Sequence, residues 1–271
     1  MVINVIKATG EKEPFSEDKV RQSVQRAGIP KELQHQVVNH VKGKLYENIP
    51  TSEIYSHISE FLGKSASYTQ AKYSLKQAIM QLGPTGYPFE DFVAEILKRE
   101  GYATQLRSIL SGTCVTHEID VIAQKENEKV MIEAKFHNQS GIRTDVHVSL
   151  YIKARFDDIK EKYNLKQAWL VTNTKVTSDA LAYALCANMK VISWSYPEGE
   201  SIRDLIEKFD LHPVTVLTSL SQNFKQQLLD NHIVLCKELF DNESVLDSIG
   251  IPKDDKKKIL EEARLVCTSH V

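Results

Sequence analysis

Two carboxylates and a lysine stand close together in the segment Val115–Asn138, which has the pattern of a β-hairpin. Apolar and polar residues alternate in both halves, as in strands with one buried face. Since side chains two positions apart share a face of a strand, we expect Asp120 and Glu133 on one face, with Lys135 beside them. Such groups at strand ends suit the binding of a hard cation and a phosphate. A solvated face with cross-strand ion pairs explains the same pattern, so the spacing leaves both interpretations open.

The same alternation makes predictions for the apolar residues of the hairpin. Ile119 and Val121 are expected on one face of the first strand. In the second strand, Ile132 and Phe136 are expected on the face opposite to that of Glu133.

Composition bounds the classes of protein that the chain can belong to. Its 271 residues suffice for two or three domains, and 42% of them are hydrophobic. The formal net charge is −2, so any DNA-binding surface must be local. We find no apolar run long enough for a membrane span and no charged-then-apolar leader. The isolated cysteines Cys114, Cys186, Cys236 and Cys267 argue against a zinc site or disulfide framework and for a reducing cytoplasm.

The segment after the linker Gly83–Gly86 is predicted to alternate helices with strands. Gln167–Thr172 is a continuous apolar run of the kind that is buried on both faces of a sheet. In order, the predicted elements are a helix at 87–101, a strand at 103–110, the hairpin, a helix at 146–162, a strand at 167–172, a helix at 178–188 and a strand at 191–194.

This order, with the hairpin motifs Glu118–Asp120 and Glu133–Lys135, resembles the Mrr-type restriction endonucleases and the related archaeal Holliday-junction resolvases. Both belong to the PD-(D/E)XK nuclease superfamily. Glu90 matches the acidic residue that this group carries on its first helix, and the run WLVTNTKVTSDALAYA matches its strand, polar loop and helix. Asp120 lacks the preceding proline of the superfamily's name, as is usual in the Mrr branch. The resemblance implies metal-dependent hydrolysis of phosphodiester bonds in DNA.

The residue types at these positions suggest a role for each. Asp120 and Glu133 would hold one or two Mg²⁺ or Mn²⁺ ions, with the carbonyl of Ala134 as a further ligand. Lys135 would orient or deprotonate the attacking water, or stabilise the charge that develops on the phosphate. Glu90 would complete a metal shell or bind a water.

Further polar residues surround this set, each with two open interpretations. Glu118 either ligates the metal or is solvated. His117 and His137, just outside the motif, fit strand-end polar residues or phosphate contacts better than metal ligands. Lys153 and Arg155 on the following helix contact DNA phosphates or form a solvated face.

The first 84 residues are predicted to form a strand pair followed by four helices. A strand at 2–8 precedes helices at 17–27, 31–46, 51–62 and 67–82, and Ser16 is placed to cap the first helix. This segment resembles the ATP-cone, a nucleotide-binding regulatory module. The matching residues, in order, are V-I-K with Gly10, Phe15 with Lys19, Thr51-Ser52-Glu53-Ile54, and Ala71 with Tyr73.

The ATP-cone resemblance implies binding of ATP or dATP, with Lys7 and Lys19 at the phosphates. The family commonly has a basic residue after the first of these lysines, where this chain has Ala8. A small helical domain that kept the fold and lost the ligand is the open alternative. The chain has no P-loop pattern, which argues against Walker-type ATP hydrolysis.

The C-terminal 74 or so residues are predicted to be helical, with helices near 202–206, 217–229, 233–240, 245–249 and 254–266. The run L-D-S-I-G-I-P followed by I-L-E-E-A resembles the second half of a helix-hairpin-helix unit. That family implies DNA phosphate contacts near Gly250 and Lys253. The usual second glycine is absent, since Pro252 stands there, so a helical bundle for dimerisation or packing stays open.

Together these patterns predict an α/β protein with an ATP-cone at 1–84, a nuclease domain with a mixed sheet at 85–197 and a helical region at 198–271. We expect a magnesium-dependent, cytoplasmic DNA endonuclease that acts in restriction or DNA repair, responds to ATP or dATP and forms a homodimer. A nucleotide-responsive DNA-binding regulator with a silent nuclease fold is the alternative, and an interaction protein assembled through its cone domain is a third.

Overall fold

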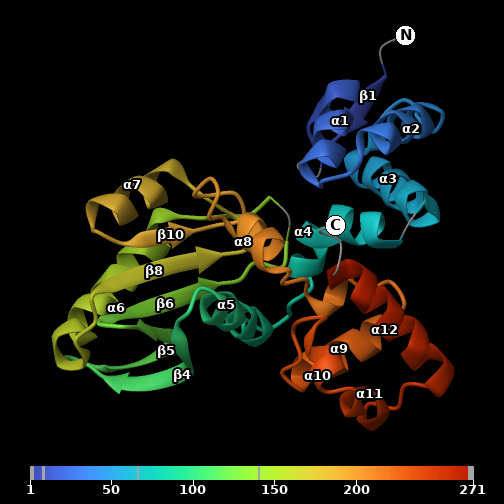
Figure 1. The fold of residues 1–271 in the computed structure, drawn as a ribbon. Coiled ribbons are helices and arrows are strands. Elements are labelled where there is room, and N and C mark those ends of the chain that lie inside the picture. The colour runs from blue at the N-terminus through green and yellow to red at the C-terminus, as the bar shows by residue number, and fades with distance from the viewer. Residues whose placement is uncertain (1–2, 8–9, 66, 140, 268–271) are drawn as a thin grey trace.

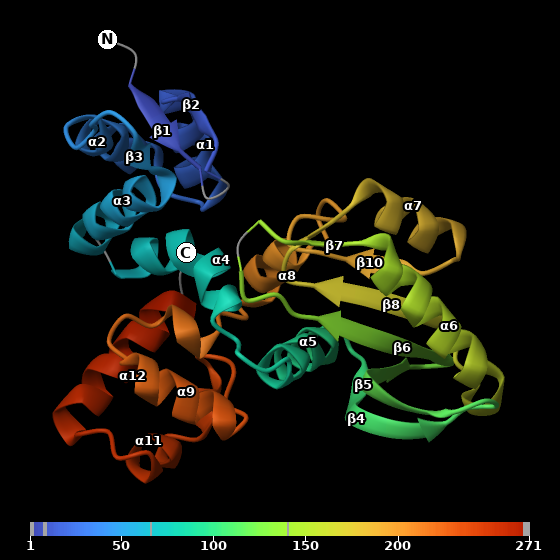
Figure 2. The same ribbon diagram turned by 180° about the vertical axis from the view of Figure 1, so that it is seen from behind.

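The computed structural model describes residues 3–7, 10–65, 67–139 and 141–267. An N-terminal helical region, a central sheet with helices and a C-terminal helical region lie around α4 (Ser67–Met80) and α5 (Tyr87–Arg99) (Figures 1 and 2). The predicted mixed α/β class is confirmed by this arrangement.

The N-terminal region combines a small sheet with amphipathic helices. β1 (Asn4–Ile6) pairs antiparallel with β2 (Lys12–Pro14) and parallel with β3 (Ile49–Pro50). The helices α1 (Glu17–Arg26), α2 (Lys31–Lys42) and α3 (Thr51–Ser65) bury their apolar stripes against this sheet and each other. As predicted, the Ser16 hydroxyl caps α1 by accepting a hydrogen bond from the Lys19 amide at 3.3 Å.

The central sheet has five strands in the order β10-β8-β6-β5-β4. β4, β5 and β6 form an antiparallel meander, whereas β6, β8 and β10 are parallel. Helices cross over between the parallel strands, as such connections require. The strands are β4 (Ala103–Ser111), β5 (Thr116–Lys125), β6 (Glu128–Lys135), β8 (Gln167–Thr172) and β10 (Lys190–Ile192).

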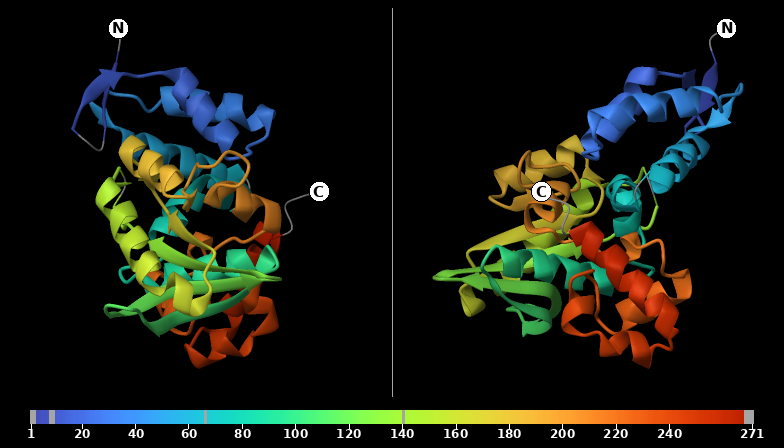
Figure 3. Two further views of the ribbon diagram at one scale, coloured as in Figure 1. Left: turned by 90° about the vertical axis from the view of Figure 1, so that its left-hand side faces the viewer. Right: turned by 45° about the vertical axis from the view of Figure 1, so that its right-hand side comes forward.

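Two hydrophobic cores cover the two faces of this sheet. α5 and α8 (Ile202–Phe209) pack on one face, and α6 (Val146–Tyr163) and α7 (Ser178–Cys186) pack on the other (Figure 3). The alternation predicted for β6 is confirmed, because Ile132 belongs to the α5 core and Met131 to the α6 core.

The alternation predicted for β5 is wrong at one point. Val121 packs in the α5 core, but Ile119 packs in the α6 core, so two residues expected on one face lie on opposite faces. The break falls at Asp120, opposite Arg107 on β4, whose backbone is left-handed with φ 49°. A left-handed residue interrupts the pleat, and the period of two does not continue across it.

Two further strands have no counterpart in the sequence-based prediction. β7 (Arg143–Thr144) pairs parallel with β9 (Lys175–Val176) beside the end of the main sheet. Each strand has only two residues, and so short a segment shows no periodicity.

Helix α4 joins two cores that are otherwise separate. Tyr73 packs in the core of the N-terminal region. Leu75, Ile79 and Leu82, which follows the helix, pack in the core shared by the sheet and the C-terminal region. The buried Thr215 hydroxyl donates a 2.7 Å hydrogen bond to the Ala78 carbonyl near the end of α4. One helix therefore carries contacts from the N-terminal region into the rest of the protein.

The C-terminal region is a group of short helices around a long one. They are η1 (Val214–Val216), α9 (Gln222–Asp230), α10 (Glu238–Asp241), α11 (Ser244–Ser248) and α12 (Lys253–Cys267). The helix predicted at 233–240 is wrong in its first half. There the backbone is extended, because Leu235 bridges to Pro213 and the Cys236 amide donates to the His212 carbonyl at 2.9 Å.

We predict that Thr215→Val lowers the free energy of unfolding by about 1 kcal/mol, because it removes a buried hydrogen bond at nearly constant volume. Urea denaturation followed by circular dichroism measures this change. Thr116→Val, at an exposed position of β5, serves as the control. An unchanged midpoint for Thr215→Val would show that the contact with α4 contributes nothing.

Candidate active site

The candidate site lies where β5 and β6 separate. Their registered pairs end at Val121 and Ile132. Beyond that point the Asp120 carboxylate takes the place of a strand partner and accepts a 2.8 Å hydrogen bond from the Ala134 amide. Because the N–H and C=O of a strand residue point to the same side, the Ala134 carbonyl also faces this opening. Asp120 is half-buried, and burial raises the pKa of its carboxyl.

Glu133 reaches the opening from the α6 side of the sheet. Its carboxylate forms an ion pair with Arg155 of α6, which also donates a hydrogen bond to the Glu118 carbonyl. Burial and the nearby Asp120 charge raise the pKa of Glu133 to about 7, and Arg155 opposes that shift. Arg155 is only 7% exposed, so its guanidinium belongs to the site and not to the solvated helix face expected as an alternative.

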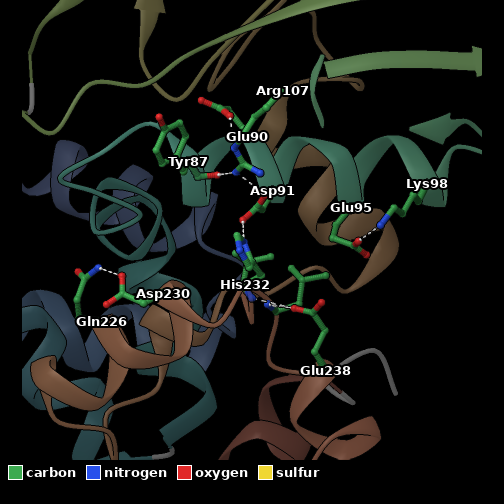
Figure 4. A network of polar contacts seen from close by, with 12 residues as sticks. Tyr87, Glu90, Asp91, Glu95, Lys98, Arg107, Gln226, Asp230, His232 and Glu238 are labelled. Carbon is green, nitrogen blue, oxygen red and sulfur yellow. Dashed lines mark hydrogen bonds and ion pairs between the residues drawn. The ribbon is translucent and has the colours of Figure 1, made fainter. Parts of the chain in front are cut away.

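Glu90 approaches from the opposite face, on the first turn of α5. It is buried, and this burial, with the charge of Asp120, raises the pKa of Glu90 to about 7. Arg107 of β4 opposes the shift, with its Nε 3.0 Å from Glu90 Oε2. Figure 4 shows Arg107 among the residues at this end of α5. Sequence reasoning missed Arg107, because a left-handed arginine in mid-strand has no sequence signature.

The structure thus gathers Glu90, Asp120 and Glu133 around one opening, with Lys135 close by. Lys135 is exposed at the end of β6, and its charge lowers the pKa of both Asp120 and Glu133 against the larger effect of burial. Glu118 is exposed, and its charge acts on Asp120 in the opposite direction. The hairpin therefore contributes two acidic residues and a lysine to this opening, and α5 contributes a third acidic residue.

Both histidines next to the motif have structural partners. His117 lies 2.8 Å from Asp158 through its Nε2, and that carboxylate also accepts hydrogen bonds from two amides of the β4–β5 turn. His137 lies 3.0 Å from the Thr144 hydroxyl, and its amide donates to Asn173 Oδ1 at 2.9 Å. These contacts shape the loops on either side of the opening.

The donor groups at the opening fit a magnesium-like cation. Across the described ranges of the chain, no group of three or more His, Cys, Asp or Glu side chains is assembled as a metal cluster. Mg²⁺ usually takes only one or two carboxylates, with water and substrate phosphates completing its shell. Asp120, Glu133 and the Ala134 carbonyl can supply that smaller set. Within the described residues, the buried Oε2 of Glu90 accepts no hydrogen bond of good geometry, although it lies 3.0 Å from Arg107 Nε.

Comparison with known proteins places each region in a family. An ATP cone domain model matches residues 3–76, a restriction endonuclease model of the Mrr catalytic type matches 83–198, and the model called AF1548-like, C-terminal matches 212–267. An uncharacterized protein of Archaeoglobus fulgidus is 36% identical over 175 residues, which cover 64% of this chain and 99% of the relative. The chain belongs to the AF1548-like family.

A solved structure supports the same assignment. The crystal structure of AF1548, a protein of unknown function, matches with a TM-score of 0.60 and 35% identity, over 68% of this chain and 98% of its own. The resemblances to the ATP-cone and to the Mrr-type nucleases are therefore confirmed. The helix-hairpin-helix resemblance stays a prediction. None of the helices in the described parts of the chain has the length and apolar character needed to cross a bilayer.

In the ATP-cone domain, a cavity of about 230 Å³ lies between β2, α1, α3 and α4. Lys19 lines this cavity together with Ser16, Thr51 and the stacked rings of Tyr55 and Tyr73. The ATP-cone match implies that this domain binds nucleotide.

The other lysine that we expected at the phosphates is held in ion pairs outside this lining. Lys7 lies 3.0 Å from Glu11 and from Glu13, and Glu13 also pairs with Lys19 at 2.8 Å. Ala8, where the ATP-cone family commonly has a basic residue, lies outside the described residues.

The residues proposed for DNA contact in this AF1548-like chain lie apart from one another. Lys153 is on α6 and forms an ion pair with Asp157. Gly250, with φ 80°, and the exposed Lys253 lie between α11 and the start of α12. Figures 1 and 2 place α11 at the end of the C-terminal region that is away from the sheet. Their contact with DNA stays a prediction.

We predict that the stability of the metal-free protein falls as the pH rises towards 8. Glu90 and Glu133 have pKa values of about 7 when folded, above their ordinary value of 4.5. The folded protein therefore keeps protons that the unfolded chain releases, and this contribution is complete below pH 4.5 and lost as the pH rises through 7. Melting temperatures in EDTA from pH 5 to 8 should fall less steeply for Glu133→Gln than for the wild type or Glu128→Gln. If the melting temperatures of Glu133→Gln and of the wild type fall equally steeply with pH, the prediction is wrong.

Proposed function

We propose that this protein is a metal-dependent DNA endonuclease of restriction or repair, whose activity responds to ATP or dATP. The observation that carries the proposal is the opening between β5 and β6. There Asp120, Glu133 and the Ala134 backbone face one space, with Lys135 at its edge and Glu90 opposite. The Mrr-type domain match supports the same chemistry.

Hydrolysis of a phosphodiester requires an activated water, relief of phosphate charge and a stabilised leaving oxygen. A Mg²⁺ ion held by Asp120, Glu133 and the Ala134 carbonyl would lower the pKa of a water and screen the phosphate. Lys135 orients or deprotonates the water and stabilises the charge that develops on the phosphate. Glu90, whose carboxylate is paired with Arg107, would bind a metal-bound water.

We predict that Asp120→Asn, Glu133→Gln and Lys135→Met each reduce cleavage at least 100-fold, because each removes a cation ligand or a proton-transfer group. Nicking of supercoiled plasmid in Mg²⁺ and in Mn²⁺ measures the loss. Glu128→Gln, at the exposed far end of β6, should cut like the wild type. If all three variants fold and still cut, these residues do not form the catalytic centre.

One observation favours a second candidate, a nucleotide-responsive DNA-binding regulator with a silent nuclease fold. Glu133 already forms an ion pair with Arg155, so its carboxylate has a partner without any cation. Gel-shift and cleavage assays on the same DNA separate the two functions. Binding without cleavage in either metal would favour the regulator.

Contacts along α4 support a response to nucleotide. Tyr73 lines the cavity of the ATP-cone domain, and Met80 lies two turns further along the same helix. The Met80 sulfur is 3.2 Å from the side-chain amide of Asn173. Asn173 bonds both the amide and the carbonyl of His137, two positions after Lys135. A shift of α4 on nucleotide binding would therefore reach the end of β6.

We predict that the protein binds ATP or dATP and that Lys19→Met weakens binding about tenfold or more, because a charge-assisted contact to phosphate is lost. Calorimetry measures the affinity, and Lys31→Met, at an exposed site outside the cavity, is the control. If the wild-type protein binds neither ATP nor dATP, the ATP-cone domain has kept its fold but lost its ligand. Light scattering in the same samples checks the expected homodimer.

A further inference from the structure

Arg107 holds a backbone conformation that an arginine seldom adopts. Its φ of 49° lies in the left-handed region, which is unfavourable for an L-residue with a side chain. The flanking pairs, Leu106 with Val121 and Ser108 with Ile119, place it directly across from Asp120. Strained residues persist where the surrounding structure determines them, and they cluster at functional sites. The contacts of the side chain show what this conformation achieves here.

The Arg107 guanidinium contacts three residues near the start of α5. It donates to the Tyr87 carbonyl at 3.0 Å and to Asp91 Oδ1 at 2.6 Å, and its Nε lies 3.0 Å from Glu90 Oε2. The guanidinium also lies over the Tyr87 ring, 4.9 Å from its centroid. The Nε contact with Glu90 is an ion pair without hydrogen-bond geometry, and a planar guanidinium can make all of these contacts at once, which a lysine cannot do.

The C-terminal region holds the other oxygen of Asp91. Nδ1 of His232 lies 2.9 Å from Asp91 Oδ2, and Asp91 is buried on α5 (Figure 4). Since an ionised carboxylate only accepts hydrogen bonds, the histidine is the donor. His232 follows α9 in a turn and is itself left-handed, with φ 59°. Its ring therefore joins the C-terminal region to the residue next to Glu90.

We propose that Arg107 is the positioning residue of the nuclease centre, and that the C-terminal region completes this centre through His232. His232 fixes Asp91, Asp91 fixes the Arg107 guanidinium, and Arg107 holds the Glu90 carboxylate beside Asp120. This inference rests on the proposed nuclease function. It assigns to the C-terminal region a part in forming the site, separate from any contact with DNA.

The first test asks whether Arg107 acts through Glu90. We expect Arg107→Met to lower kcat tenfold to 100-fold with KM unchanged, and Arg107→Lys to recover part of the loss. The double variant Arg107→Met with Glu90→Gln should cut no more slowly than Glu90→Gln alone, because residues that act through one group are not additive. Lys98→Met is the matched control, since it breaks a 2.6 Å ion pair with Glu95 on the same helix.

Two results would overturn the role of Arg107. A double variant far slower than Glu90→Gln would show that Arg107 acts on its own. A raised KM with a shallower salt dependence would show that Arg107 contacts a DNA phosphate instead. Melting temperatures identify a variant that does not fold, in which case Arg107→Lys carries the comparison with wild type.

The second test replaces His232 with each of two residues that have nearly the same shape as one another. Asparagine and aspartate both tolerate a left-handed backbone, but only asparagine keeps a donor for Asp91. We expect His232→Asn to cut clearly faster than His232→Asp, whose rate should fall towards that of Arg107→Met. Asp230→Ala, which loses a 2.9 Å hydrogen bond from Gln226 just before this turn, controls for general loosening. Equal rates for the two His232 variants would contradict the proposal.

A third measurement separates this inference from the proposed function. The ¹³C signal of the Glu90 side-chain carboxyl reports where that group is held, whether or not DNA is cut. We expect it to shift or broaden in Arg107→Met and in His232→Asp and to stay in place in Lys98→Met. An unmoved signal in the first two variants overturns the inference. If the Glu90 signal moves in these two variants but the wild-type protein cuts no DNA, the positioning role of Arg107 is supported and the proposed endonuclease function is rejected.

Discussion

The structure depends on keeping several acidic side chains buried around one opening in a sheet. Like charges at short range in a poorly solvated site oppose one another, and burial adds to the cost of ionising them. Two guanidinium groups offset this cost, one on each face: Arg155 reaches Glu133 from α6, and Arg107 reaches Glu90 from β4. Asp120 lies between them and takes a backbone amide as its partner. The sheet separates the two acid–arginine pairs, and the opening between β5 and β6 brings them together.

Because burial outweighs the two arginines, the carboxyl groups of Glu90 and Glu133 keep a strong affinity for protons. Neither arginine reverses the effect of burial, since the pKa values of Glu90 and Glu133 both stay near 7. A site in this condition gains from any cation that enters it, because the cation replaces protons and relieves repulsion among the carboxylates. The carboxylates whose burial opposes their ionisation would therefore favour binding of a metal ion under the proposed function.

Much of the fold could be predicted from local patterns. The apolar run Gln167–Thr172 is a central strand with the predicted bounds, and the alternation of β6 places Glu133 on the α6 side as the pattern implies. The failures come from interactions that the sequence does not display. Arg107 breaks the alternation opposite Asp120, and the segment near Leu235 is extended because distant backbone groups bond to it. Arg155 looked like a helix-surface residue, but its partner is a glutamate 22 positions earlier.

Helix α4 carries a consequence for how such a protein could have arisen. The ATP-cone match ends at residue 76, in the middle of this helix, while Ile79 and Leu82 are fully buried in the core of the other regions. A gene fusion joined at that boundary would have left half a helix on each side of the joint. In the structure α4 is one continuous helix that packs in the cores of both the cone and the nuclease, so the two domains share one element.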